Sequence, residues 1–356
     1  MGDNQPNMAD IAERKVDHLD LATSGDVGFK RTTTLFECVR LVHDALPELD
    51  VDAIDLGTTL LGKKLRAPIL IAGMTGGADR AQRINLELAA IAEERGYAFG
   101  VGSQRAMHKR SEAKSTYQVR GVAPNALVLG NLGIVQAAKM SSEAVRELVG
   151  AIGADALCVH LNPAMEIVQE EGDRDFRFGL DTLARLVSEL GVPVIAKETG
   201  CGLSLATAAK LRRAGVMHVD VSGAGGTSWV AVETHRARAE KKALGQAFWE
   251  WGVPTAASVA WVQRHGFETI FATGGMQNGL DIAKAIALGA NAGGIARAAL
   301  QALERGGPSG AREFFQAVEA ELRAALLLTG SANVAALRQA PRVIVGELKD
   351  WLSQSI

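Results

Sequence analysis

Eight short apolar runs recur along the chain, and longer stretches with helical periodicity separate them. The runs are apolar throughout rather than alternating, which is typical of parallel strands covered on both faces. Several of the helical stretches end in glycine, the usual residue just past a helix C-terminus. The pattern predicts an α/β fold whose strands span residues 67–74, 97–103, 126–132, 156–162, 192–198, 217–223, 268–275 and 291–297.

Residues 253–266 fit either a ninth strand or a helix. Pro254 suits the first turn of a helix, and the apolar segment continues as far as Gly266, so we interpret it as a helix. Eight strand–helix units then remain, which is the number in a closed (β/α)8 barrel, or TIM barrel. A doubly wound open sheet is the alternative, and the count of eight favours the barrel.

The flanking regions lack this alternation. We expect residues 1–66 to be an N-terminal extension that packs on the barrel, and residues 67–304 to be the barrel itself. Residues 305–356 are predicted to add C-terminal helices to the same domain, because the segment is strongly amphipathic. Residues 224–252 form a long excursion after the sixth strand and are a candidate lid.

Composition narrows the function classes. The chain has 356 residues, 47% of them hydrophobic, and a formal net charge of −2, so no overall field favours nucleic acid or an anionic membrane. The apolar runs fall short of the roughly 20 residues of a membrane span. The three cysteines, Cys38, Cys158 and Cys201, show no CxxC spacing, and the first fifteen residues show no apolar signal segment. We therefore expect a cytoplasmic protein that binds neither membranes nor nucleic acid.

Polar residues collect where the predicted strands end. In a barrel of this kind the active site lies at the C-terminal ends of the strands. Polar strand-end loops occur in every such fold, so one position alone says little, whereas a series of eight is a stronger indication. The candidates are Thr75, Gly76, Ser103, Gln104, Arg105, Asn131, His160, Asn162, Lys197, Ser222, Thr227, Gly274, Gly275 and Arg297.

Gly274 and Gly275 are the most specific part of that series. Two glycines after the seventh strand let backbone N–H groups approach a phosphate, and the next helix N-terminus supplies positive potential. The loops after strands seven and eight form the common phosphate site of these barrels, and Arg297 follows the eighth strand. Glycines also serve in plain tight turns. We favour the phosphate interpretation.

Three readings of Lys197 are open. It emerges from an apolar strand, so desolvation and neighbours decide its charge. It could form a Schiff base, it could face the electron-rich end of a flavin ring, or it could pair with Glu198. Adjacent strand residues point to opposite faces, which weakens the last reading.

Residues 158–176, CVHLNPAMEIVQEEGDRDF, begin as a strand and end in a cluster of charge. This segment is either a solvated loop or a site for a metal and a charged substrate. A second anion site is predicted from Arg14, Lys15 and His18 near the N-terminus, with Arg105 as a further cation, although a short charge run alone is usually solvated.

The motifs resemble, in order, the signature blocks of type 2 isopentenyl diphosphate isomerase. The resemblance extends from about residue 13 to about residue 300. It is carried by RKVDH, APILIAGMTGG, GVGSQRAM, LGNLG, HLNPAMEIVQEEGDRDF, KETGCGLS, VDVSGAGGTSW and ATGGMQNGLDIAKAIALGA.

The resemblance implies an enzyme of isoprenoid biosynthesis that interconverts isopentenyl and dimethylallyl diphosphate. It would use reduced FMN and Mg²⁺, with NADPH supplying the electrons, and it would form a homo-oligomer, a tetramer or larger. His160, Asn162 and Lys197 would be catalytic, and Glu166 would bind the metal. The implied FMN contacts are Met74, Thr75, Gly76, Ser103, Asn131, Lys197, Ser222, Thr227, Gly274, Gly275, Ala296 and Arg297. The implied substrate contacts are Arg14, Lys15, His18, Ser103, Gln104, Arg105 and Met165.

One position departs from the family pattern. The family usually has His-Leu-Asn-x-x-Gln-Glu, and here Met165 stands at the glutamine position. A thioether can neither donate a hydrogen bond nor carry a proton. This leaves two alternatives to the isomerase: another FMN-dependent barrel enzyme that acts on a related prenyl substrate or a 2-hydroxy acid, and a non-catalytic relative that binds flavin or prenyl diphosphate.

Overall fold

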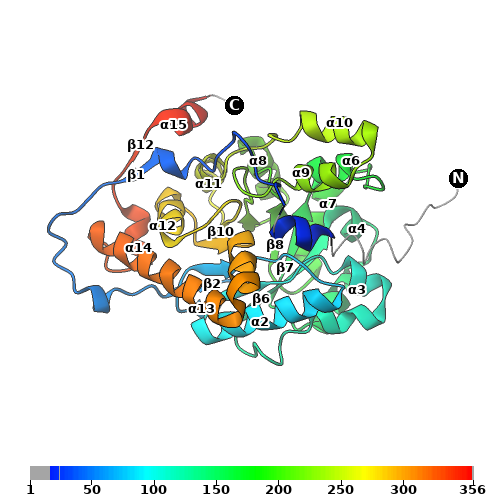
Figure 1. Ribbon diagram of the computed structural model, residues 1–356, viewed down its shortest axis with the longest axis horizontal. Coiled ribbons are helices and arrows are strands. Elements are labelled where there is room, and N and C mark those ends of the chain that lie inside the picture. The colour runs from blue at the N-terminus through cyan, green and yellow to red at the C-terminus, as the bar shows by residue number, and fades with distance from the viewer. Residues whose placement is uncertain (1–16, 24, 355–356) are drawn as a thin grey trace, which may run out of the picture.

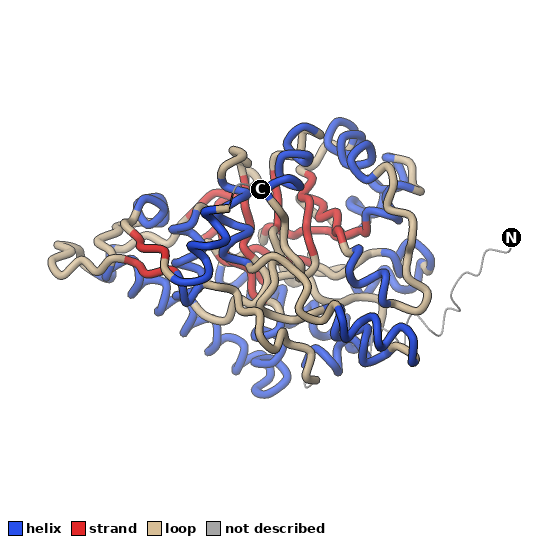
Figure 2. Tube along the Cα trace, turned by 90° about the horizontal axis from the view of Figure 1, so that it is seen from above, coloured by secondary structure: helices blue, strands red, loops and turns tan. Residues whose placement is uncertain are grey.

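The computed structural model describes residues 17–23 and 25–354, and it contains a closed barrel of eight parallel strands. Around the barrel the strand order is β10-β11-β4-β5-β6-β7-β8-β9, so each strand pairs with its neighbours in sequence and β11 closes onto β4. Figure 2 shows the strands in the middle of the molecule with helices around them. The strands are β4 (Ile69–Ile71), β5 (Ala98–Gly100), β6 (Leu127–Gly133), β7 (Ala156–Leu161), β8 (Val194–Glu198), β9 (His218–Asp220), β10 (Thr269–Ala272) and β11 (Ala292–Ile295).

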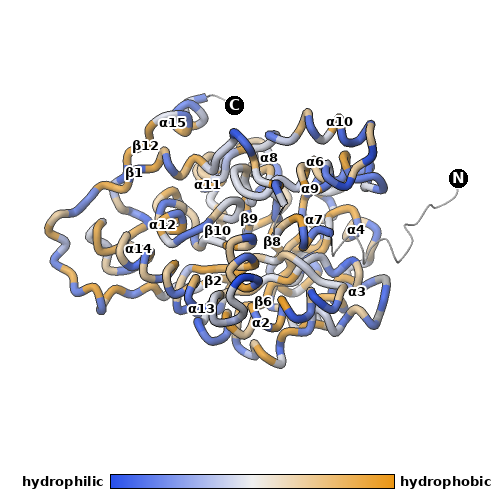
Figure 3. Tube along the Cα trace, in the orientation of Figure 1, coloured by the Kyte–Doolittle hydropathy of each residue, from blue (hydrophilic) through white to orange (hydrophobic). Residues whose placement is uncertain are grey.

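Helices cover the outside of the barrel (Figure 1). They carry both hydrophobic and hydrophilic residues along their length, as a helix between core and solvent must (Figure 3). Those that follow barrel strands are α2 (Asp79–Arg95), α3 (Arg105–Lys109), η3 (Ser111–Tyr117), α4 (Ile134–Ala138), α5 (Ser142–Ala151), α6 (Pro163–Val168), α7 (Gly179–Glu189), α8 (Leu205–Arg213), α9 (Trp229–Arg236), α10 (Ala239–Ala247), α11 (Thr255–Gln263) and α12 (Gly279–Leu288).

The predicted helix limits have identifiable causes. Ser141, Ser204 and Asn278 each cap a helix N-terminus by accepting a backbone N–H, at α5, α8 and α12. Gly96 and Gly289 end α2 and α12 in the left-handed conformation. The segment 253–266 is helical, as predicted, because Pro254 stands at the N-cap of α11. The closed barrel and the eight predicted strands are confirmed.

Two segments that lie far apart in the sequence pair outside the barrel. Strand β1 (Val39–Leu41) pairs antiparallel with β12 (Arg342–Ile344), so that Val39 lies opposite Ile344 (Figure 1). The remaining elements of these flanks are η1 (Phe36–Cys38), η2 (Val51–Ala53), α13 (Arg297–Leu328), α14 (Val334–Gln339) and α15 (Gly346–Ser353). Gly307, with φ 60°, and Pro308 kink α13.

A hairpin of β2 (Thr58–Leu60) and β3 (Lys63–Leu65) closes the N-terminal end of the barrel. Leu60 and Leu65 belong to the same apolar cluster as the inward side chains of the barrel strands, including Leu70 and Phe271. The hairpin therefore buries apolar surface at this end of the barrel, away from the C-terminal strand ends where active sites of this fold lie.

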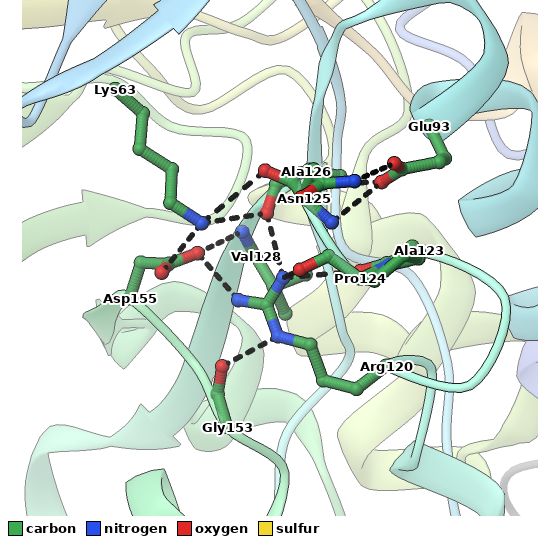
Figure 4. Close-up of polar contacts among 10 residues, drawn as sticks. All are labelled: Lys63, Glu93, Arg120, Ala123, Pro124, Asn125, Ala126, Val128, Gly153 and Asp155. Atoms are coloured by element: carbon green, nitrogen blue, oxygen red, sulfur yellow. Dashed lines mark hydrogen bonds and ion pairs between the residues drawn. The ribbon is translucent and has the colours of Figure 1, made fainter.

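Beside the hairpin lies a polar cluster, which we call the floor network and which Figure 4 shows. Lys63 Nζ is 2.8 Å from Asp155 Oδ1, and Arg120 Nη2 donates to Asp155 Oδ2 at 2.6 Å. Glu93 accepts N–H groups of Asn125 and Ala126. These contacts tie the hairpin to the segments that precede β6 and β7.

Candidate active site

A cavity of about 550 Å³ opens at the C-terminal ends of the barrel strands. Loops after every barrel strand contribute to its wall, as expected where parallel strands end on one side. Most of the predicted site residues come together there: His18, Met74, Thr75, Ser103, Arg105, Asn131, His160, Asn162, Met165, Glu166, Lys197, Ser222, Thr227, Gly274, Gly275, Ala296 and Arg297.

Two predicted residues do not line the cavity. Gln104 is fully buried; its amide donates to the carbonyl of Leu148 at 2.8 Å and accepts the N–H of Asn131 at 3.0 Å. Its side chain therefore holds two loops together and does not reach the cavity, where a substrate contact was predicted. Gly76 packs on the ring of Tyr117, where an added Cβ would lie 2.0 Å from the ring. The predicted contacts Arg14 and Lys15 lie outside the described residues.

Gly274 and Gly275 form a cradle after β10. Both have positive φ, 96° and 78°, which L side chains rarely adopt. A Cβ at Gly274 would lie 2.2 Å from the carbonyl oxygen of Gly223, so the loop is packed too tightly for a side chain. The N-terminus of α13 begins next to the cradle at Arg297, with no side-chain cap on its N–H groups. Open N–H groups and a helix N-terminus are what a phosphate group requires.

Lys197 is held by two partners that the sequence did not identify. Its Nζ donates to Asp220 Oδ2 at 2.7 Å and to Thr273 Oγ1 at 3.3 Å. Thr273 in turn donates to Asp220 Oδ1 at 2.6 Å. Asp220 is the last residue of β9 and is 1% exposed. Asp220 is a charged residue within the apolar segment 217–223, and that was the sequence signal for its role.

Glu198 does not pair with Lys197 by hydrogen bonding. Its carboxylate accepts the backbone N–H groups of Thr199 and Gly202 instead, together with that of Cys201. Burial raises the pKa of Glu198 to about 8. The pairing of Lys197 with Glu198 is therefore wrong, and Glu198 organises the loop that follows β8.

The cavity wall contains one residue with a strained backbone and one buried hydroxyl without a hydrogen-bond partner among the described residues. Thr75 Oγ1 is buried and has no hydrogen-bond partner among the described residues. Ser222 has φ 36°, which is unusual for a residue with a side chain and is typical of functional sites. His160 Nδ1 lies 2.8 Å from Asn131 Oδ1, which fixes the ring orientation. The Thr75 hydroxyl could hydrogen-bond a polar ring, and the cradle at Gly274 and Gly275 could bind a phosphate in the same cavity. The residues present therefore fit a ligand that combines a polar ring system with a phosphate, as FMN does.

Glu166 lies on the opposite side of the barrel from the cradle, in α6. Asn162 Nδ2 donates to Glu166 Oε1 at 2.7 Å, and the N–H of Asp173 donates to Oε2 at 2.7 Å. Burial raises the pKa of Glu166, and these two hydrogen bonds oppose the effect only in part. A bound cation would favour the ionised form. The neighbouring Met165 places its sulfur 4.0 Å from Asn162 Nδ2.

The helical turn over residues 17–23 covers one side of the cavity. His18 Nε2 lies 2.8 Å from Glu233 Oε1 in α9, and its ring meets Trp229 edge-on at 5.4 Å. Arg297, the predicted phosphate ligand, lines the cavity, but two of its guanidinium nitrogens donate to the carbonyls of Ala22 and Gly25. Arg297 thus holds the N-terminal segment as well as facing the cradle.

The described residues contain no group of three or more His, Cys, Asp or Glu side chains that could hold a metal by themselves. Nor does any helix among residues 17–23 and 25–354 have the length and apolarity needed to cross a membrane.

Comparison with known proteins gives the family. The model of the FMN-dependent dehydrogenases matches residues 8–161 and 160–343. The isopentenyl-diphosphate delta-isomerase of Thermococcus kodakarensis is 44% identical over 356 residues, covering 96% of this chain and 94% of its own. That of Methanosarcina barkeri is 43% identical, again covering 96% and 94%. The chain belongs to the isopentenyl-diphosphate delta-isomerase family.

Solved structures agree with the fold expected for this isomerase family. A mandelate oxidase variant with a monooxide FMN adduct superposes with a TM-score of 0.66 at 16% identity, covering 96% of this chain and 100% of that one. A lactate oxidase of Pediococcus acidilactici gives 0.66 at 14% identity, covering 97% and 96%. At such low identity the likeness concerns the barrel alone.

Proposed function

We propose that this protein isomerises isopentenyl diphosphate to dimethylallyl diphosphate, with FMN, Mg²⁺ and a diphosphate substrate in the cavity described above. The observation that carries the proposal is one cavity with two unlike sides. One side holds the glycine cradle at Gly274 and Gly275, and the other holds Arg105 and Glu166. Strands β10 and β11 lie across the closed barrel from β6 and β7, so the two sides of the cavity would bind different phosphorylated molecules.

The cradle, Thr75 and Lys197 would hold FMN. When bound in its reduced form, FMN supplies a ring that can give and accept a proton beside the substrate. Asp220 and Thr273 hold the Lys197 side chain in place at that position by hydrogen bonds. This arrangement requires no reorganisation when charge develops nearby.

Glu166 would bind Mg²⁺ together with the oxygens of the substrate diphosphate. Mg²⁺ is commonly held by one or two carboxylates plus phosphate oxygens, so a single buried carboxylate is a sufficient protein contribution. Arg105 would neutralise part of the remaining diphosphate charge, and His18 would lie beside it. His160 and Asn162 would then lie along the five-carbon chain, where one carbon gains a proton and another loses one.

The test is a product assay. The protein loaded with FMN and reduced under anaerobic conditions should convert isopentenyl diphosphate to dimethylallyl diphosphate when Mg²⁺ is present. Oxidised protein and protein treated with a chelator should be inactive. NADPH should replace the chemical reductant, and no product under any of these conditions would refute the proposal.

Met165 supports a second candidate. Because a thioether cannot carry a proton, the cavity could serve another FMN-dependent reaction on a related prenyl substrate or a 2-hydroxy acid. Net reduction or reoxidation of the flavin by such a substrate would identify this activity. A non-catalytic binder would instead bind diphosphate tightly and show no exchange of deuterium from heavy water into the substrate.

We extend the proposal to the setting of the protein. We propose a cytoplasmic homo-oligomer, a tetramer or larger, whose barrel at 67–304 carries an extension at 1–66 and helices at 305–356. Light scattering coupled to gel filtration measures the mass in solution, and a mass close to the 37.5 kDa of one chain would contradict the oligomer.

A further inference from the structure

The loop after α6 places a second carboxylate, Asp173, behind the diphosphate end of the cavity. Its side chain is 16% exposed, whereas Asp175 in the same loop is 58% exposed and pairs with Arg177, two residues further on. A merely solvated charge run would expose both. Asp173 is drawn inward because it contacts the segments after β5 and β6 and Glu166 in its own segment after β7.

The first contact is through the backbone. The N–H of Asp173 donates to Glu166 Oε2 at 2.7 Å, while Asn162 holds the other oxygen. The approach depends on Gly172, where an added Cβ would lie 1.8 Å from the carbonyl oxygen of Glu166. The carboxylate that we assign to Mg²⁺ is therefore oriented from both sides.

The second set of contacts is through the side chain. Gln136 Nε2, in α4, donates to Asp173 Oδ2 at 2.6 Å. Arg105 Nη1 lies 3.6 Å from the same oxygen, and Lys139 Nζ lies 3.7 Å from Oδ1. Both ion pairs exceed hydrogen-bond length, so Asp173 attracts the two cations without using up their donors. Arg105 Nε is in fact buried with no hydrogen-bond partner among the described residues.

We propose that Asp173 is a positioning residue that sets Glu166 and Arg105 in register for a magnesium diphosphate. This inference rests on the proposed function, because it assumes that the two residues bind such a ligand. Asp173 does not touch the ligand itself. It connects the loops after β5, β6 and β7, which carry Arg105, Gln136 and Glu166, so that the cation and the carboxylate are held at a fixed separation. Groups behind metal ligands commonly set their orientation in this way.

The test compares Asp173→Asn with Asp175→Asn in the FMN-loaded protein. Asparagine keeps the size of the side chain and the backbone N–H but removes the charge that attracts Arg105. Calorimetry with magnesium pyrophosphate should show binding about tenfold to a hundredfold weaker for Asp173→Asn. Asp175→Asn should bind like the unaltered protein. The FMN dissociation constant, measured by fluorescence quenching, should be the same in all three.

Kinetics separates positioning from a structural defect. In Asp173→Asn the KM for isopentenyl diphosphate should rise while kcat falls by less than about threefold, because the reacting carbons are not touched. Asp173→Glu should restore part of the pyrophosphate affinity. If Asp173→Asn fails to fold, Gln136→Leu provides the same comparison from the other end of the hydrogen bond.

The outcomes are distinct. Unchanged magnesium pyrophosphate binding in Asp173→Asn would overturn the inference, and so would parallel loss of FMN, which would indicate a structural defect. If the unaltered protein binds magnesium pyrophosphate but forms no dimethylallyl diphosphate, the proposed function fails. A weaker Asp173→Asn would in that case still support the positioning role.

Discussion

The two ends of the barrel handle polar groups in opposite ways. At the floor network Asp155 accepts from Lys63, Arg120 and the N–H of Val128, and Arg120 donates to several carbonyls (Figure 4). At the cavity end Thr75 Oγ1 and Arg105 Nε are buried with no partner among the described residues. Leaving a buried polar group unpaired costs about 1 to 3 kcal/mol. The charged groups of the floor network are paired within the chain, whereas these two buried atoms at the cavity end have no partner among the described residues.

The largest expected effect comes from the cavity end. Lys197→Met leaves Asp220 buried without its cation, so we expect kcat to fall about a hundredfold or more and FMN to bind more weakly. Steady-state kinetics at saturating FMN and a flavin titration measure both. Lys63→Met, the matched change in the floor network, should lower Tm and leave kcat unchanged. Equal losses of kcat in the two variants would remove the distinction between the ends.

The next largest effect concerns the floor. Asp155→Ala leaves Lys63 and Arg120 without their shared carboxylate, and we expect the free energy of unfolding to fall by about 2 to 3 kcal/mol. Denaturant unfolding measures it, with the exposed Asp175→Ala as the control. A kcat that falls in proportion to stability would contradict the separation of the two ends.

The same carboxylate predicts a pH dependence. Burial would raise the pKa of Asp155, but hydrogen bonds from Lys63, Val128 and Arg120 outweigh it and lower the pKa below 3.8. The contribution of Asp155 to stability is therefore complete above that value and is lost as the pH falls through the lower folded-state pKa. Acid unfolding of Asp155→Ala should lack this component.

Glu166→Gln gives a smaller and more selective effect. The amide retains the size of the side chain but is a poor ligand for Mg²⁺, so magnesium-dependent substrate binding should weaken about tenfold to a hundredfold. FMN binding should persist, because Glu166 lies across the barrel from the cradle. Loss of FMN with an unchanged metal dependence would show that Glu166 has been assigned to the wrong ligand.

The smallest expected effect is a gain. Met165→Gln restores an amide that can donate a hydrogen bond at the cavity wall, and we expect the isomerase rate to rise by no more than about tenfold. Product formation from isopentenyl diphosphate measures the rate. A lower isomerase rate in Met165→Gln, together with reduction of the flavin by a prenyl substrate or a 2-hydroxy acid in the unaltered protein, would favour the second candidate function.

Periodicity predicted the barrel because parallel strands are apolar on both faces, whereas the helices that cover them are apolar on one face. The two patterns alternate eight times along the chain, so the strands and helices could be told apart. The site followed from geometry, since residues at the ends of successive strands share one rim. Gln104 does not line the cavity for a local reason: it is the N-cap residue of the short helix α3, and its side chain turns into the barrel wall.

Other residues could not be predicted from neighbouring positions. Asp220 pairs with Lys197 across two strands, and Glu233 reaches His18 across 215 positions of sequence. Asp173 and Asp175 stand two residues apart in one charged segment, and the sequence does not indicate that one turns inward. The first contact depends on the register of β8 and β9, and the others depend on how helices and loops pack, and neither leaves a periodic signal in the sequence.

The pairing of β1 with β12 has a consequence for synthesis. Val39 pairs with Ile344, so strand β1 has no partner during synthesis until residues 342–344 have left the ribosome. Trimming the last fifteen residues would expose an edge close to the beginning of the protein.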